Sequence, residues 1–151
     1  MAKPKNASWD FPIPLIYPRT YLAIAEEHGL QGKELMRQAG LKVRDLSDAQ
    51  QSFSMVEMDR LLQVIVAALG DIGIGFEVGW RLPPTAYGSF GYALLCSSTV
   101  EEALKICLRY WHLIGKGLAV TADIQDKICV IDFVPQIPIS SEIDRRIMVE
   151  A

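Results

Sequence analysis

A chain of 151 residues, half of them hydrophobic and 22% charged, is long enough to bury a core and too apolar to be disordered over most of its length. Its formal net charge of -3 lacks the basic excess on which non-specific nucleic-acid binding depends. The composition therefore argues against a stand-alone DNA-binding protein.

The cysteines Cys96, Cys107 and Cys129 are widely spaced and have apolar neighbours in the sequence, which predicts reduced core thiols and a cytoplasmic location. The polar residues 1–8 lack the apolar centre of a secretion signal. The apolar run 64–69 is far shorter than the roughly 20 residues of a membrane span. We expect no membrane association, no metal and no cofactor.

The first elements in chain order are a tail and two short helices. Residues 1–10 are predicted to be a flexible tail, and 11–151 a single domain. A helix is expected from about Pro18 to His28, ending at Gly29, and a second over 33–39, ending at Gly40, because glycine favours left-handed helix ends. Their spacing resembles a helix-turn-helix, but acidic residues at 26, 27 and 34 oppose DNA contact.

A longer helix follows. Ser54 and Glu57 have the spacing of a capping box, Phe53 can pack onto Met58, and the apolar residues continue at helical spacing up to Gly70. A further helix over 72–80 is expected, with its N-cap at residue 71. The glycines at 73 and 75 follow a helix rather than a strand, so a dinucleotide-binding loop is not expected.

The paired prolines Pro83 and Pro84 must end that helix, because proline lacks an amide donor and restricts the residue before it. Gly88 and Gly91, beside aromatic residues, suggest close packing against other backbone. The next helix is expected to begin at a Ser98 cap with Glu101 in the capping-box position. It has a solvated polar stripe that includes residue 112, and an apolar side that includes residue 111.

A hairpin is predicted over 118–134, turning at 125–127, and its second strand is apolar on nearly both faces, which favours a central or covered strand. A last helix, capped by Ser140 or Ser141, has no C-cap signal before Ala151, so we expect the domain to be truncated there. The predicted fold is α+β, mostly helical with a β-hairpin or small antiparallel sheet packed on the helices.

The run from Phe11 to Ala151 resembles the N-terminal effector domain, of the arabinose-binding type, of AraC/XylS-family bacterial transcription regulators. The likeness rests on these residues: Ile13-Pro14-Leu15, Gly29-Leu30, Ala39-Gly40-Leu41, Gly73 to Gly79, Arg81-Leu82-Pro83-Pro84-Thr85-Ala86-Tyr87-Gly88, Gly91-Tyr92-Ala93-Leu94-Leu95 and Ser97-Ser98-Thr99.

The resemblance implies a small-molecule sensing and dimerisation domain, with DNA bound only through a C-terminal helix-turn-helix domain that is absent from this chain. It implies no particular sugar specificity, because the pattern here is mostly helical whereas the name-giving regulator uses a strand-rich barrel. The alternative is a domain for dimerisation or protein contact that binds no ligand.

Aromatic walls and a few polar anchors are what a small-molecule pocket requires. The candidate ligand-binding residues are Arg19, Tyr21, Trp80, Arg81, Tyr87, Phe90, Tyr92 and Trp111. Arg81 is the expected anchor for a carboxylate or phosphate, since guanidinium binds such groups bidentately. An enzyme is not expected, because the sequence has no metal-binding cluster and no nucleophile with an evident base.

Overall fold

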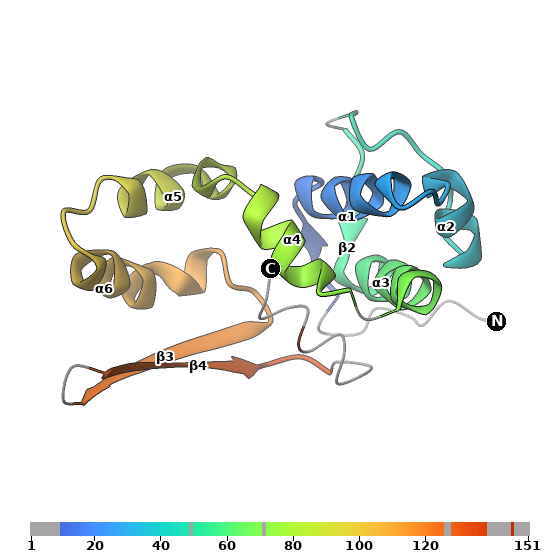
Figure 1. The fold of residues 1–151 in the computed structure, drawn as a ribbon. Helices are drawn as coiled ribbons and strands as arrows, with labels where there is room; N and C mark the ends of the chain where they lie inside the picture. Colours follow the sequence, from blue (N-terminus) through green and yellow to red (C-terminus); the bar gives the residue numbers. More distant parts are fainter. Residues whose placement is uncertain (1–9, 49, 71, 126–127, 139–145, 147–151) are drawn as a thin grey trace. The chain divides into compact units, whose positions relative to one another are not determined.

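A computed structural model describes residues 10–48, 50–70, 72–125, 128–138 and 146 (Figure 1). The described residues before Pro83 form one compact unit, called here the first unit, and Pro83–Pro138 form the second unit. The predicted α+β class is confirmed, since helices dominate and the strands form small antiparallel pairs. The predicted tail and last helix lie outside the described residues, apart from positions 10 and 146.

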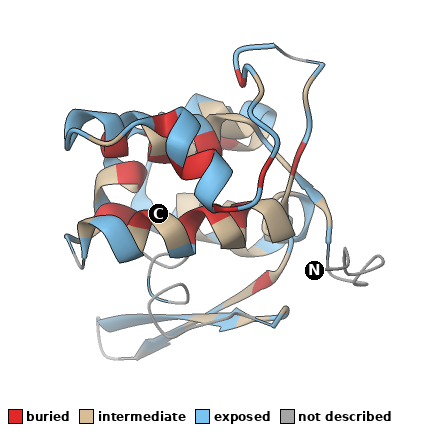
Figure 2. Cartoon of the chain, turned by 90° about the vertical axis from the view of Figure 1, so that its right-hand side faces the viewer, coloured by how far each residue is buried: buried red, intermediate tan, exposed pale blue. Residues whose placement is uncertain are grey.

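The first unit contains four helices, α1 (Ile16–Glu27), α2 (Gly32–Gln38), α3 (Met55–Leu69) and α4 (Ile74–Arg81). Strands β1 (Pro12–Ile13) and β2 (Phe53–Ser54) pair antiparallel, with Ile13 opposite Phe53. Figure 2 shows buried residues on the facing sides of these helices. The most deeply buried large side chains are Phe53, Ile24, Leu61, Ile65, Val78 and Pro18.

The helix ends in this unit follow the local sequence. The Ser54 hydroxyl accepts a hydrogen bond from the Glu57 amide at 3.3 Å, and the Glu57 carboxylate accepts one from the Ser54 amide at 3.0 Å, which confirms the capping box. Gly29 and Gly40 adopt φ angles of +84° and +67°. The residue after each donates its amide to a carbonyl five positions back, so both predicted left-handed ends are confirmed.

Helix α4 begins later than predicted. Gly73 is its N-cap and has φ +68°, a left-handed conformation that interrupts the helix before Ile74, so the expected start at Ile72 was wrong. The expected cap at residue 71 lies outside the described residues. Helix α4 continues to Arg81 and Leu82 is its C-cap, so the paired prolines end it as predicted.

The second unit begins with η1 (Pro84–Tyr87) and α5 (Gly88–Leu95), followed by α6 (Val100–Tyr110) and η2 (Trp111–Leu113). Strands β3 (Leu118–Gln125) and β4 (Ile128–Pro135) then form the predicted hairpin, with Leu118 opposite Pro135 and Gln125 opposite Ile128. Helix α6 starts one residue later than expected. Thr99 is its cap and accepts from the Glu102 amide at 3.1 Å, while Glu102 accepts from the Ser98 amide at 2.8 Å.

The prediction that β4 is central or covered was wrong for the part of the chain that the structure describes. There β4 pairs with β3 alone. Its apolar side chains Ile128, Val130, Ile131 and Val134 are all exposed. The apolar pattern was read correctly, but burial depends on what packs against a strand, and that information is not local.

Among the described residues, no single helix is long and apolar enough to cross a membrane. Helices α3 and α4 pass the same test only as a pair bent by 119°, by length and composition alone.

Candidate functional site

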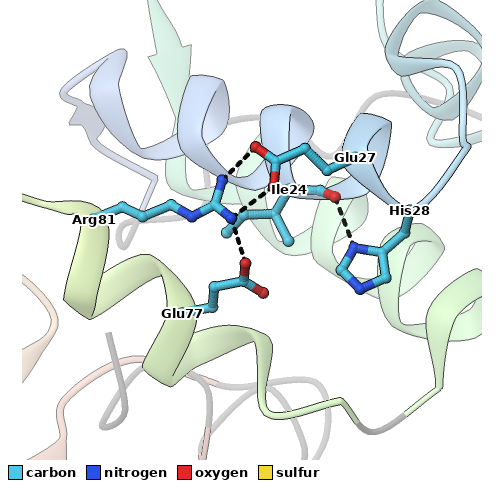
Figure 3. Close-up of polar contacts among 5 residues, drawn as sticks. All are labelled: Ile24, Glu27, His28, Glu77 and Arg81. Atoms are coloured by element: carbon cyan, nitrogen blue, oxygen red, sulfur yellow. Dashed lines mark hydrogen bonds and ion pairs between the residues drawn. The ribbon is translucent and has the colours of Figure 1, made fainter.

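Arg81, the predicted anion anchor, lies at the last position of α4 and is engaged by two carboxylates of its own unit (Figure 3). Its Nη1 and Nη2 atoms donate to the two carboxylate oxygens of Glu27, at the end of α1, each at 2.7 Å. Nη2 also donates to Glu77, one turn earlier on α4. We call Glu27, Glu77 and Arg81 the Arg81 cluster. Its bidentate geometry is the one in which a guanidinium best binds a carboxylate.

Arg81 and Glu27 each stabilise the charged form of the other, which shifts the pKa of both. The hydrogen bond from Arg81, and then its positive charge, hold the pKa of Glu27 below its ordinary value, while the hydrogen bond to Glu27 raises the pKa of Arg81. The side chains of Arg81 and Glu27 remain 31% and 57% exposed, so solvent screens the pair and it contributes little to stability. The cluster therefore orients Arg81 more than it stabilises the fold, and a ligand carboxylate would have to replace Glu27.

The other predicted residues of the first unit do not gather around Arg81. Tyr21 is only 3% exposed and belongs to the hydrophobic core. Arg19 is exposed and its Nε donates to the carbonyl of Leu15 at 3.3 Å. Trp80 is 92% exposed, and one position along a helix turns a side chain by about 100°, so it projects from a different side of α4 than Arg81.

The predicted aromatic residues of the second unit are spread over three elements. Tyr87 lies half-buried in η1, and Phe90 and Tyr92 lie in α5, the latter 59% exposed. Trp111 begins η2, and its indole Nε1 donates to the carbonyl of Leu118 at 2.6 Å. Its ring also meets Phe133 edge-to-face at a centroid distance of 6.2 Å. Trp111 thus joins η2 to the start of β3, a structural contact that fills its one donor.

Close backbone packing in the stretch after the paired prolines, predicted from its glycines, is confirmed for Gly91. A methyl group added at this buried residue would overlap the carbonyl oxygen of Pro84 and lie 2.5 Å from its carbonyl carbon. Gly88 instead has φ +59° and open space around it. The two glycines therefore allow α5 to turn back and pack directly on η1.

A shallow recess of about 340 Å³ in the first unit was not predicted. It lies where the turn between α1 and α2 meets α3, and its volume falls at the lower end of the range for small-molecule sites. Glu34 in this recess already accepts from Arg37 at 3.0 Å and Gln38 at 3.3 Å. The lining residues are Gly29, Leu30, Gln31, Glu34, Leu35, Gln38 and Ala68. Apart from the helix-ending glycine, nothing in these residue types could have distinguished them in the sequence.

The prediction of core thiols was wrong for Cys96 and Cys129, which are exposed; only Cys107 is half-buried, and burial raises the pKa of its thiol. His112 is exposed, as predicted. Within the described ranges, no three His, Cys, Asp or Glu side chains converge to form a metal site.

Comparison with known proteins finds a family match over most of the chain. Residues 29–147 match the family described as the N-terminal arabinose-binding domain of AraC transcription regulators. A protein named ornithine utilization regulator, from Pseudomonas aeruginosa, is 23% identical over 141 residues, which are 93% of this chain and 41% of that relative.

Two uncharacterized HTH-type transcriptional regulators, from Mycobacterium bovis and Mycobacterium tuberculosis, are each 28% identical over 109 residues. The matched part is 72% of this chain and 32% of each relative. The chain thus spans less than half the length of these curated relatives.

Proposed function

Because this chain belongs to the family of N-terminal arabinose-binding domains of AraC transcription regulators, we propose that it senses a small metabolite, dimerises, and controls a helix-turn-helix DNA-binding domain. The family match over residues 29–147 carries this proposal, and relatives named as transcriptional regulators support it. DNA contact through a separate domain agrees with the net charge of -3. The regulator would act in the cytoplasm, and the chain would not be an enzyme.

For the effector, the proposed anchor is Arg81, through exchange of its internal partner. The Glu27 carboxylate occupies both outer nitrogens of the guanidinium, and a ligand carboxylate of the same geometry would take its place. Arg81 is partly exposed, which leaves it accessible to such a ligand. The other candidate residues of the first unit, Arg19, Tyr21 and Trp80, do not gather around Arg81, so the proposed anchor is Arg81 alone.

A thermal-shift screen of the chain tests the sensing proposal. The panel contains sugars, carboxylic acids and amino acids, with ornithine included because one relative is named for ornithine utilization. An effector at a hundredfold excess over its Kd should stabilise the folded chain by about 2.7 kcal/mol. Arg81→Ala should abolish the shift produced by a carboxylate ligand. Arg109→Ala, which removes an exposed arginine of α6 over Tyr110, is the control and should retain it.

The second candidate function is a dimerisation or protein-contact domain that binds no metabolite. The observation that favours it is the filled guanidinium of Arg81, because no ligand is needed to complete its hydrogen bonds. A panel in which nothing raises the melting temperature, with a chain that nevertheless dimerises, would support this function and overturn the sensing proposal.

A further inference from the structure

Helix α4 has large apolar side chains on opposite sides. Ile74 and Val78 are 3% and 0% exposed and pack into the core of the first unit. On the other side, Phe76 is 67% exposed and Trp80 is 92% exposed. A helix that is apolar on more than its core-facing side is typically buried by a further partner. The outward side of α4 therefore has the composition of a contact surface.

The Arg81 cluster fixes which side of α4 faces outward. Phe76 and Trp80 are four positions apart and so lie about 40° from each other around the helix. Glu77 and Arg81 each follow one of these aromatic residues, about 100° further round, and Arg81 is joined to Glu27 of α1. A rotation of α4 that buried these aromatic residues in the first unit would expose Ile74 and Val78 and break this ion pair.

The outward surface also lacks charge. Besides the aromatic residues it includes the glycines Gly73 and Gly79, which lie within about 60° of Phe76 around the helix. Interface centres are enriched in aromatic residues and depleted of charged ones. We call Phe76 and Trp80 the α4 apolar face.

We propose that the α4 apolar face is the surface through which two copies of this chain associate. The inference rests on the dimerisation part of the proposed function and names the residues that carry it. In a two-fold contact the same surface meets itself, so an uncharged apolar face needs no complementary charge on its partner. The neighbouring charged side chains Glu77 and Arg81 are already paired, because Arg81 donates to both Glu77 and Glu27.

The exposed area is of the size that such a contact needs. A large aromatic side chain covers on the order of 150–250 Å². At the observed exposed fractions, the α4 apolar face then presents about 350 Å² per copy, or about 700 Å² in a symmetric pair. Stable interfaces begin near a total of about 1,200 Å², of which about 60% is apolar. The face thus supplies the apolar centre of a small dimer, and the surrounding polar surface would supply the rim.

Sedimentation of the chain over a range of concentrations tests this assignment. We expect a dimer that dissociates on dilution. Trp80→Ser should weaken it by about 30-fold or more, since tryptophan at the centre of a contact is a typical hot spot, and Phe76→Ser should weaken it in the same direction. The control is Val100→Ser, which removes an 86% exposed apolar side chain from α6 and should leave the dimer unchanged. Far-ultraviolet circular dichroism checks that each variant is folded.

A chain that stays monomeric at every concentration would overturn the inference, as would a folded Trp80→Ser variant that dimerises as tightly as the wild type. Neither outcome touches ligand sensing, which the thermal-shift panel measures independently. Conversely, a dimer that depends on Trp80 in a chain that responds to no metabolite would support this inference and overturn sensing.

Discussion

Replacing Gly91 by alanine should destabilise the second unit, although alanine is the better helix former. Alanine in a helix interior is favoured over glycine by about 1 kcal/mol. At Gly91, however, the added methyl would overlap the carbonyl oxygen of Pro84 and lie 3.3 Å from the Thr85 amide nitrogen. These are backbone atoms, so relief requires moving α5 away from η1 rather than turning a side chain.

Overpacking a tightly packed site costs typically 1–3 kcal/mol, and an overlap with backbone belongs at the top of that range. Subtracting the gain in helix propensity leaves a net loss of about 2 kcal/mol. In urea, with a slope near 2 kcal/mol per molar, the midpoint of unfolding should fall by about 1 M.

The assay is urea unfolding of the chain followed by circular dichroism, with Ser89→Ala as the control. Ser89 is an exposed residue of the same helix, so this change gains helix propensity without adding an atom near Pro84. The two substitutions should shift the midpoint in opposite directions. If Gly91→Ala raises the midpoint as Ser89→Ala does, the close approach of α5 to η1 is refuted.

Two further predictions concern the Arg81 cluster and the start of α6. Since Arg81 holds the pKa of Glu27 below its ordinary 4.5, the ion pair's stabilisation is complete above pH 4.5 and is lost as pH falls through the lower folded-state pKa. In the Arg81→Ala variant the pKa of Glu27 should therefore rise towards its ordinary value, measured by NMR titration of the carboxyl groups, and an unchanged pKa would contradict the pairing. Thr99→Ala should lower the free energy of unfolding by about 1 kcal/mol, because it removes the N-cap of α6, whereas Ser98→Ala should lower it by only about a few tenths. Thermal unfolding measures both changes. A larger loss for Ser98→Ala than for Thr99→Ala would indicate that Ser98 is the cap.

Features that depend on neighbouring residues could be predicted from the sequence. Ser54 and Glu57 are three positions apart, and that spacing alone determines the capping box. The start of α6 was missed by one position because Ser98 and Thr99 can both cap. Glu101 and Glu102 likewise both suit the capping-box position, so local chemistry did not distinguish the two alternatives.

Features that depend on distant residues could not be predicted. Arg81 was predicted to bind a ligand carboxylate or phosphate, whereas the partner that it has in the structure, Glu27, lies 54 positions earlier in the chain. The exposure of β4 depends on whether another element covers it, and its apolar sequence is the same in either case. The recess beside Glu34 is formed by a turn and two helices whose residues have no distinctive chemistry.

The carboxylate of Glu57 contacts both Ser54 and Arg44, so the energetic effects of these three residues depend on one another. Glu57 Oε2 accepts from the Ser54 amide at 3.0 Å and from Arg44 Nη2 at 2.6 Å, and the Arg44 guanidinium lies over the Phe53 ring, 4.8 Å from its centroid. The Nε atom of Arg44 is buried and has no hydrogen-bond partner in the described structure. Replacing Glu57 would thus leave the half-buried Arg44 guanidinium without its carboxylate partner and would also remove the N-terminal cap of α3. In evolution, these positions should be replaced together rather than singly, because their energetic effects are not additive.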